Sequence, residues 1–505
     1  MLFNSYIFVF LFFPICLVGY YGLMHFQTNT AAKIFLIAMS LWFYGYFNIS
    51  YLLIMICSIG VNYLFHRVSS RRPQKAVIIL AVTANLGVLF YFKYFDFFLT
   101  TINTVFDTSV ALHNILLPLG ISFFTFQQIS FVADTYHGEV RNCSFVDYAL
   151  FVSFFPQLIA GPIVNHSEML PQFAQIGKKS ILWERIAEGL GLFILGLAKK
   201  VLIADTFGAA VDYGYANIAL IGRLDAILVI VFYSLQLYFD FSGYCDMARG
   251  IGKMLGIEIP INFNSPYKAV NIIDFWKRWH MTLNRFFTKY VYIPLGGNRK
   301  GAGKTYRNLM IVFLLSGLWH GAGLNYLVWG AMHGVLYVLT RFWQKNLRPY
   351  WMEGKTASVR SDQAMGLRLR NAIVTRVSSI LLFAYVAVAW VYFRAADIAQ
   401  ANRMLYTAVK GPVQKISTDL TSCFQVDEFW YVIKVLHLDN TAYSRYLLMW
   451  IILAIGVYLS MIGRNAAQRM ERVKYRTSSA AIFAVLALWC VLTFSKVSTF
   501  LYFNF

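Results

Sequence analysis

The stretch LMIVFLLSGLWHGAGLNYLVWGAMHGVLYVLT, residues 309–340, decides the fold class of this chain. It contains no Asp, Glu, Lys or Arg. A helix needs about 20 mostly apolar residues to cross a bilayer. We interpret the stretch as part of two spans, 307–319 and 324–343, separated by His320 and the small residues that follow it. A pair of such runs indicates an integral membrane protein.

The composition of the whole chain agrees with this interpretation. Its 505 residues are 59% hydrophobic, 18% aromatic and only 13% charged, with a mean hydropathy of +0.57, whereas soluble chains are about 25% charged. These values exclude a water-soluble enzyme, a disordered protein, a collagen-like chain and a disulfide scaffold. The net charge of +21 fits the excess of Lys and Arg in cytoplasmic loops. We therefore expect membrane lipid, and no nucleic acid, among the partners.

The other apolar runs predict a polytopic bundle. About 11 transmembrane helices are expected in one all-α integral-membrane domain covering 1–505, and the first run is expected to be a retained span and not a signal peptide. No internal repeat is visible, which counts against a transporter built from matched halves. The further candidate spans are 5–25, 33–48, 50–65, 76–95, 112–132, 146–164, 187–204, 224–241, 374–393, 445–462 and 478–497.

The charges of the loops predict the orientation. The basic loops 66–75, 345–376 and 463–477 should be cytoplasmic, because Lys and Arg are retained on that side. The stretch 394–444 is mixed in sign and should form an extracytoplasmic loop. This order places the C-terminus, 501–505, outside the cytoplasm.

Residues 258–306 are too polar to span a membrane and too aromatic for an ordinary loop. A structureless loop of this length is unusual in a compact domain. Irregular backbone at membrane depth is tolerated where it lines a wet cavity. We therefore expect short interfacial helices and a re-entrant catalytic segment here.

His320 is the first catalytic candidate. Apolar residues precede it, and Gly317, Gly321 and Gly323 surround it, so a ligand should be able to approach the ring. An ionisable group at membrane depth indicates function, and a neutral imidazole suits proton abstraction from a thiol or hydroxyl. The alternative is a histidine that joins neighbouring helices by a hydrogen bond.

His280 is the second candidate. With Asp274 as the N-cap, helical spacing would place Trp276, His280 and Asn284 on one face. The cation Arg278 suits a phosphate. The alternative is an amphipathic helix anchored at the interface. His333 would face away from His320 if one helix held both, so it is expected to be structural.

The turn GGNRKGAGKT, residues 296–305, lacks the spacing and the preceding strand of a phosphate-binding P-loop. Arg299 and Lys300 could still bind phosphate there, or the turn is an ordinary basic loop. The six cysteines and the remaining histidines show no metal-ligand spacing, so no metal is expected. Asp240 and Asp246 are expected to form ion pairs, with Arg249 as the partner.

Motifs along most of the chain carry a resemblance to a known family. The segments are MLFNS at 1–5, LPLGISF at 117–123, FFPQLIAGP at 154–162, KVLIAD at 200–205, QLYFDFSGY at 236–244, FWKRWH at 275–280, YIPLGGNRKG at 292–301 and GLWHGA at 317–322. With these segments the chain resembles the membrane-bound O-acyltransferases (MBOAT), and within them the alginate O-acetylase-like branch.

The resemblance implies a bundle of about 11 helices, with re-entrant or interfacial helices around a central tunnel, in a bacterial inner membrane. It implies transfer of acetyl from a cytoplasmic thioester, with acetyl-CoA as the expected donor substrate and no permanently bound cofactor. It places the catalytic residues at His320 and His280. Arg278, Arg299 and Lys300 are then candidates for the donor phosphates.

The resemblance also implies an extracytoplasmic SGNH-type acetyltransferase and polysaccharide export or synthase machinery as partners, for O-acetylation of an exopolysaccharide such as alginate. The run MTLNRFFT at 281–288 departs from the alginate enzymes, so another polymer such as cellulose stays open. The alternatives are transfer of D-alanyl or another acyl group to a cell-wall polymer, or a non-enzymatic polysaccharide transporter or scaffold.

Overall fold

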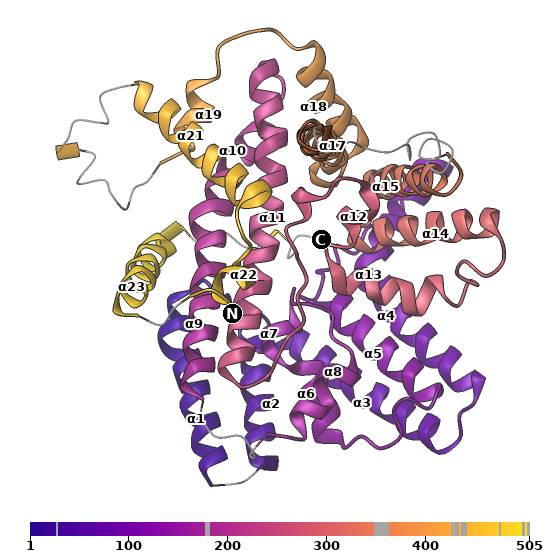
Figure 1. The fold of residues 1–505 in the computed structure, drawn as a ribbon. Coiled ribbons are helices and arrows are strands. Elements are labelled where there is room, and N and C mark those ends of the chain that lie inside the picture. Colours follow the sequence, from indigo (N-terminus) through magenta and orange to yellow (C-terminus); the bar gives the residue numbers. More distant parts are fainter. Residues whose placement is uncertain are drawn as a thin grey trace. The chain divides into compact units, whose positions relative to one another are not determined.

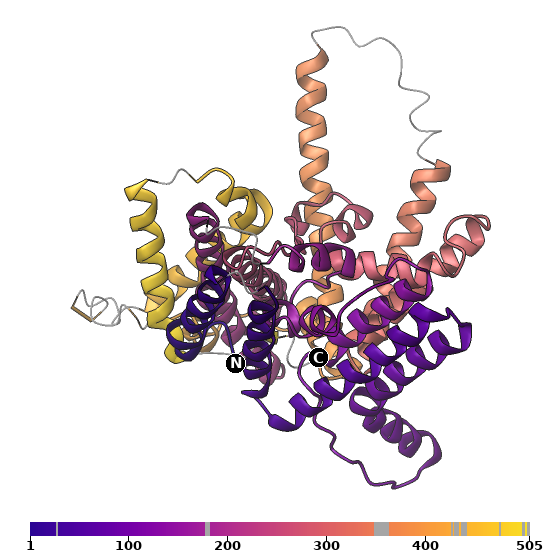
Figure 2. The ribbon, with the colours of Figure 1, turned by 90° about the horizontal axis from the view of Figure 1, so that it is seen from below.

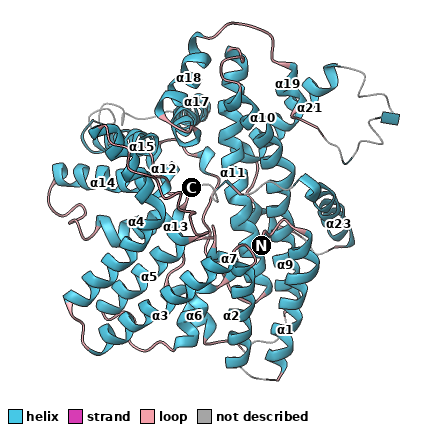
Figure 3. Ribbon diagram, turned by 180° about the vertical axis from the view of Figure 1, so that it is seen from behind, coloured by secondary structure: helices cyan, strands magenta, loops and turns pink. Residues whose placement is uncertain are grey.

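The protein is described by a computed structural model that covers residues 1–26, 29–176, 182–347, 363–425, 428, 434–435, 442–473, 476–496 and 500–501. These residues form helices joined by loops, and no strand occurs among them (Figures 1 and 3). The expected all-α fold class is confirmed. Of the expected extracytoplasmic C-terminus, residues 502–505 lie outside the described residues.

The α-helices have the following bounds: α1 Phe13–His25, α2 Asn29–Gly45, α3 Ile49–Arg71, α4 Lys75–Phe106, α5 Ile121–Tyr136, α6 Phe145–Ser153, α7 Phe155–Leu158, α8 His166–Phe173, α9 Trp183–Ala198, α10 Asp205–Ala216, α11 Arg223–Met254, α12 Ile272–Trp276, α13 Met281–Phe287, α14 Ala302–His320, α15 Leu324–Phe342, α17 Gln363–Arg394, α18 Ile398–Lys410, α19 Thr418–Ser422, α21 Ala442–Val457, α22 Ala466–Met470 and α23 Thr477–Leu492. Short π- or 3₁₀-helical turns extend several of them: η1 Phe8–Phe12, η2 Lys199–Ala204, η3 Pro266–Lys268, η4 Thr288–Tyr292, η5 Trp343–Leu347, η8 Tyr458–Ile462 and η9 Thr493–Lys496.

Six helical segments among the described residues are long and apolar enough to cross a membrane: Phe8–His25, Ile49–Arg71, Lys75–Phe106, Arg223–Met254, Ile373–Arg394 and Ser444–Ile462. This confirms a multi-pass membrane protein, while the count of about 11 stays a prediction. The apolar run 146–164 does not form one helix, because the chain breaks at Phe154 between α6 and α7.

The chain divides into two compact units. Unit 1 contains Met1–Leu202, Asp240–Ile261 and Ala466–Phe505, and unit 2 contains Ile203–Phe239 and Asn262–Asn465. The long helix α11 contributes its first half to unit 2 and its second half to unit 1. Neither unit is therefore one continuous piece of the sequence.

In unit 1, helices α3, α4 and α5 pack on one another (Figure 2, in purple). Elsewhere in the unit, α9 lies against the second half of α11 through two pairs of glycines. A Cβ on Gly189 would lie 2.6 Å from the carbonyl oxygen of Gly250, and one on Gly196 would lie 2.6 Å from that of Gly243. Each helix thus has two glycines seven residues apart, and small residues let membrane helices approach closely.

Ion pairs flank this glycine contact. Nζ of Lys200 lies 2.6 Å from Asp240, with both side chains almost fully buried, and Nζ of Lys199 lies 2.6 Å from Asp246. Arg249 is 3.9 Å from Asp246. The expected ion pairing of the two aspartates is confirmed, but lysines of η2 are the closer partners, and for Asp240 the expected partner Arg249 is wrong.

In unit 2, α14 and α15 form a tight antiparallel hairpin that packs on α17. A Cβ on Gly317 would lie 2.3 Å from the carbonyl oxygen of Tyr326, and one on Gly321 would lie 2.1 Å from the ring of the same tyrosine. The expectation that these glycines leave open space for a ligand is therefore wrong. They are small because the returning helix occupies that space.

The polar segment 258–306 folds as expected into short helices, namely η3, α12, α13 and η4. Helix α12 packs against α15 and η3. Lys268, which ends η3, donates a hydrogen bond of 2.5 Å to the carbonyl oxygen of Gly463 after η8. These contacts hold the short helices within unit 2, next to the α14–α15 hairpin.

Candidate functional site

His320 ends α14 inside a cluster of aromatic rings in unit 2. Its ring centroid lies 4.9 Å from Trp319, 5.0 Å from Trp329 of α15 and 5.3 Å from Phe393 of α17. The residue is 3% exposed. Three neighbouring rings therefore hold the imidazole in the protein interior. The tunnel that the resemblance implies around His320 stays a prediction.

The backbone determines which nitrogen of His320 carries the proton. Nδ1 lies 2.6 Å from the carbonyl oxygen of Ser316, one turn earlier in α14. A carbonyl oxygen only accepts hydrogen bonds, so Nδ1 must be the donor. In the neutral imidazole, Nε2 then bears the lone pair. The chemistry of a base is thus assigned to Nε2.

His333 lies in the same cluster. It is fully buried, and its ring lies 5.2 Å from Trp276, 5.0 Å from Trp329 and 5.8 Å from Trp390. One helix does not hold both histidines, because α14 ends at His320 and α15 begins at Leu324. The premise that they face apart on a shared helix is therefore wrong: both rings contact Trp329.

His280 occupies an unusual backbone position. Its φ of +44° and ψ of +52° place it in the left-handed region, at the N-cap of α13. Such a conformation costs about 1–3 kcal/mol for a residue with a side chain and persists where the surroundings enforce it. The expected continuous helix through Trp276, His280 and Asn284 is wrong. The chain turns sharply between α12 and α13, and Nδ2 of Asn284 donates back to the carbonyl oxygen of Trp276 at 3.0 Å.

The start of α12 also differs from the expectation. Asn271 is its N-cap and accepts from the backbone N–H of Asp274 at 3.0 Å. Asp274 instead lies in the first turn and holds Nε of Arg278 at 2.9 Å. The N-cap assigned to Asp274 is therefore wrong, because the helix begins three residues earlier.

Asn262 fixes the orientation of His280. Its Oδ1 accepts the backbone N–H of Thr282 at 3.2 Å, the hydroxyl of Thr282 at 2.9 Å and Nδ1 of His280 at 3.2 Å. A backbone N–H can only donate, so the facing atom of Asn262 must be oxygen. Nδ1 of His280 therefore carries the hydrogen, and its Nε2 bears the lone pair when the ring is neutral.

Sequence reasoning missed Asn262. It lies 18 residues before His280 and has no motif spacing to it. It is 1% exposed, in the loop between α11 and η3. The available signal was its residue type in an otherwise apolar neighbourhood, since buried amides require hydrogen-bond partners.

Burial keeps His280 uncharged. The residue is 1% exposed and lies outside the six candidate spans. Desolvation, and then the electrostatic influence of the neighbouring His320 imidazole, hold the pKa of His280 well below its usual range. His280 and His320 both lie near Trp319, whose ring centroid is 6.3 Å from the first and 4.9 Å from the second. The two sequence-predicted histidines are therefore brought into one site.

The three cationic candidates, Arg278, Arg299 and Lys300, differ in their exposure to solvent and in their position in the chain. Arg278 is engaged by Asp274 and has a side chain that is 34% exposed. Arg299 and Lys300 are exposed on the turn after η4, where Gly296 and Gly301 take φ values of +102° and +87°. A role in binding donor phosphates stays a prediction for all three.

Comparison with known proteins gives the site a context. The sequence model of a family described as "MBOAT, membrane-bound O-acyltransferase family" matches residues 135–383. The match includes both histidines and Asn262. A peptidoglycan O-acetyltransferase of Helicobacter pylori is 36% identical over 540 aligned residues, which cover 100% of this chain and 98% of the relative.

Two further relatives match shorter parts. A probable alginate O-acetylase of Pseudomonas aeruginosa is 36% identical over 414 residues, covering 80% of this chain and 74% of the relative. A teichoic acid D-alanyltransferase of Bacillus subtilis is 30% identical over 255 residues, covering 48% and 63%.

Proposed function

The chain belongs to the membrane-bound O-acyltransferase family, and on that premise we propose that it takes acetyl from a cytoplasmic thioester and passes it across the membrane for O-acetylation of a cell-surface polysaccharide. Acetyl-CoA is the proposed donor. That the chain is a multi-pass O-acyltransferase is already established by the family and its relatives, which excludes the transporter and scaffold alternatives.

The observation that carries the proposed mechanism is the hydrogen bond from Nδ1 of His320 to the carbonyl oxygen of Ser316. It leaves the lone pair at Nε2, which can accept the proton of an acceptor hydroxyl. The hydroxyl oxygen attacks the thioester carbonyl carbon, the C–O bond forms, and the proton moves to Nε2 of His320. The C–S bond then breaks, and the imidazolium returns the proton to the departing sulfur. General-base assistance of this kind contributes about 10²–10⁴ in rate.

The proposed role of His280 is limited by its hydrogen bonding. Because Nδ1–H donates to Asn262 and the ring is kept neutral, Nε2 of His280 can accept a hydrogen bond but cannot donate one. A role in orienting the acceptor hydroxyl is therefore better supported than stabilisation of an oxyanion, which requires a donor.

The proposed polymer is peptidoglycan. The support is coverage: the similarity to the peptidoglycan enzyme extends over the whole of this chain, whereas the similarity to the alginate enzyme covers 80% of it at the same identity. An alginate-like exopolysaccharide is the second candidate. D-alanyl transfer has less support, because that similarity covers about half the chain.

We further propose that the acetyl group is received outside the cytoplasm by an SGNH-type acetyltransferase, and that the protein lies in the bacterial inner membrane. Thioester donors are cytoplasmic and the polymer is extracytoplasmic, and in this proposal the second protein carries the acetyl group on to the polymer. Arg278, Arg299 and Lys300 are proposed to attract the anionic donor.

A proteoliposome assay tests the proposal. Protein is reconstituted, [acetyl-¹⁴C]acetyl-CoA is supplied on one side, and label that reaches a soluble acceptor on the other side is counted. Wild-type protein should transfer label and His320→Ala should not. In cells, the acetyl content of peptidoglycan and of exopolysaccharide is measured in parallel. Transfer at the wild-type rate by His320→Ala would refute the mechanism, and an unchanged peptidoglycan in a deletion strain would refute the proposed polymer.

A further inference from the structure

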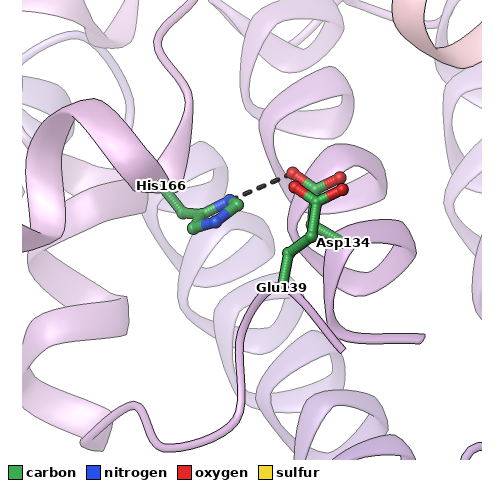
Figure 4. A group of neighbouring side chains, drawn as sticks. All are labelled: Asp134, Glu139 and His166. Carbon is green, nitrogen blue, oxygen red and sulfur yellow. Dashed lines mark ion pairs between the residues drawn. The ribbon is translucent and has the colours of Figure 1, made fainter. Parts of the chain in front are cut away.

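We propose that Asp134, Glu139 and His166 form a binding site for a divalent transition-metal ion, of the Zn²⁺ or Mn²⁺ class. The three residues lie in unit 1, at the end of α5 and the start of α8. One ligand atom from each lies within 4.8 Å of the other two. Figure 4 shows the two carboxylates and the imidazole directed toward one another. This site is independent of the proposed acyl transfer, which uses unit 2.

A turn brings the two carboxylates together. After α5, the backbone N–H of Glu139 donates to the carbonyl oxygen of Asp134 at 2.9 Å, and Gly138 donates to Thr135 at 3.0 Å. Gly138 takes a φ of +79°. These two hydrogen bonds form a Schellman motif at the C-terminus of α5. In this motif the side chain after the glycine, here Glu139, often contacts the third-last helical residue, here Asp134. An apolar pair commonly occupies those two positions, whereas here both are acidic.

The two carboxylates concentrate negative charge at this turn. Asp134 is fully buried, and Glu139 lies at the surface. Two carboxylates this close repel one another, and a positive charge nearby favours their ionised forms. A cation between them would satisfy both. The acidic pair alone would not define a site, and the third residue supplies the evidence for a ligand.

His166 is the first residue of α8 and is 7% exposed. Asn165 and Glu168 form a capping box at the start of α8, which fixes the position of the His166 backbone. Nδ1 of His166 lies 3.0 Å from Oδ2 of Asp134, yet it has hydrogen-bond geometry with no atom among the described residues. The two atoms form an ion pair by distance (Figure 4), but they are not aligned as a hydrogen bond is.

A shared ion explains this geometry. Two ligands with bonds of about 2.1 Å stand about 3.0 Å apart at an octahedral angle and about 3.4 Å apart at the tetrahedral angle of Zn²⁺, and their lone pairs point at the ion and not at each other. An imidazole N–H that donated to the carboxylate would instead point at its oxygen, because hydrogen bonds are close to linear. One imidazole with two carboxylates suits Zn²⁺ or Mn²⁺, whereas Ca²⁺ and Mg²⁺ prefer oxygen ligands alone.

The test uses the full-length protein purified in detergent. It is treated with a chelator, titrated with Zn²⁺ and separately with Mn²⁺, and then analysed for metal content and thermal midpoint. We expect about one bound equivalent of at least one of these ions, and a midpoint that rises and saturates with the bound metal. Metal-free protein with less than 0.1 equivalent bound at the end of both titrations would overturn the proposal.

Variants locate the ion. Glu139→Gln replaces an exposed residue and leaves the buried pair intact, so it should fold and bind the ion at least about 10-fold more weakly. His166→Gln should lose the ion. The matched control is His137→Gln, which removes an exposed imidazole on the same turn that could collect metal adventitiously.

The control should titrate like the wild-type protein. Loss of binding in His137→Gln, or identical titrations for Glu139→Gln and wild type, would contradict the assigned ligands. If His166→Gln does not fold, Glu139→Gln and His137→Gln still decide the question.

Discussion

Oδ1 of Asn262 lies 3.2 Å from Nδ1 of His280, and the same oxygen accepts both the backbone N–H and the hydroxyl of Thr282. One amide oxygen therefore fixes the ring orientation and the tautomer of a histidine 18 residues away. His280 has a left-handed backbone conformation, which is strained. Without the hydrogen bond to Asn262, the residue could relax and its ring could change orientation.

Removing this acceptor should impair transfer. Asn262→Leu leaves Nδ1–H of His280 without its partner, so we expect acetyl transfer to fall about 10²-fold, as for a misplaced catalytic group. Thr282→Val is the control, since it removes one of three hydrogen bonds and leaves His280 in place. The assay is transfer into proteoliposomes by both variants, with correct folding checked by gel filtration.

A charged substitution at the same position separates positioning from packing. Asn262→Asp keeps an oxygen acceptor but adds a negative charge beside Nδ1, which should raise the pKa of His280. The lower limb of the pH–activity profile should then move to higher pH. A profile that coincides with the wild-type profile would argue against any role of His280 in the reaction.

The two buried histidines of the aromatic cluster should behave differently. His320→Phe should lower acetyl transfer by about 10²–10⁴, because it removes the base. His333→Phe fills a similar volume between Trp276, Trp329 and Trp390 and should retain most of the activity. Rates of both variants in the same vesicle preparation make the comparison, and equal losses would mean that packing, and not base chemistry, accounts for the effect.

Acid should destabilise the protein partly through His280. Its pKa is well below 6.5 in the folded chain, so below pH 6.5 the unfolded chain takes up a proton that the folded chain does not. The contribution to stability is present above pH 6.5 and is lost as the pH falls, by about 1.4 kcal/mol per pH unit. The thermal midpoint of wild-type protein in detergent should therefore fall more steeply between pH 7 and 5.5 than that of His280→Gln. Parallel curves would contradict the assignment.

Two glycines of α14 provide a matched pair for stability. A Cβ at Gly317 would meet the carbonyl oxygen of Tyr326 at 2.3 Å, whereas one at Gly303 would meet nothing within 4 Å. Gly317→Ala should therefore destabilise the hairpin by about 1–3 kcal/mol. Gly303→Ala should be neutral or slightly stabilising, because alanine favours helix. The thermal midpoints of the two variants test this prediction. Equal midpoints would show that the α14–α15 hairpin can shift to accommodate the added methyl group.

The buried ion pair between Lys200 and Asp240 should be intolerant of single changes. Asp240→Asn leaves a buried ammonium without its counter-charge and should cost about 3–5 kcal/mol, while the double variant Lys200→Met/Asp240→Leu should recover much of the loss. Asp147→Asn breaks the more exposed pair with Lys33 and should cost less. A double-mutant cycle on thermal midpoints measures the coupling between Lys200 and Asp240. A midpoint of Asp240→Asn equal to the wild-type value would refute this prediction.

The sequence by itself determined that this is an all-helical multi-pass membrane protein, because a bilayer allows few alternatives for long uncharged runs such as 309–340. It also indicated the family and the two candidate histidines, since GLWHGA and FWKRWH carry them. What it could not supply was the environment of each ring. The helix break after His320, the left-handed turn at His280 and the reach of Asn262 depend on contacts between residues far apart in the chain.

The same reason explains the wrong expectations. Gly317 and Gly321 looked like space for a ligand, because sequence shows a missing side chain but not the helix that fills its place. Asp134, Glu139 and His166 showed no metal-ligand spacing, because a turn after α5 and a separate helix start bring them together. Periodicity and composition are local properties and can be read along one chain. Tautomers, ion pairs and candidate ligand sets depend on tertiary packing, which only the folded structure decides.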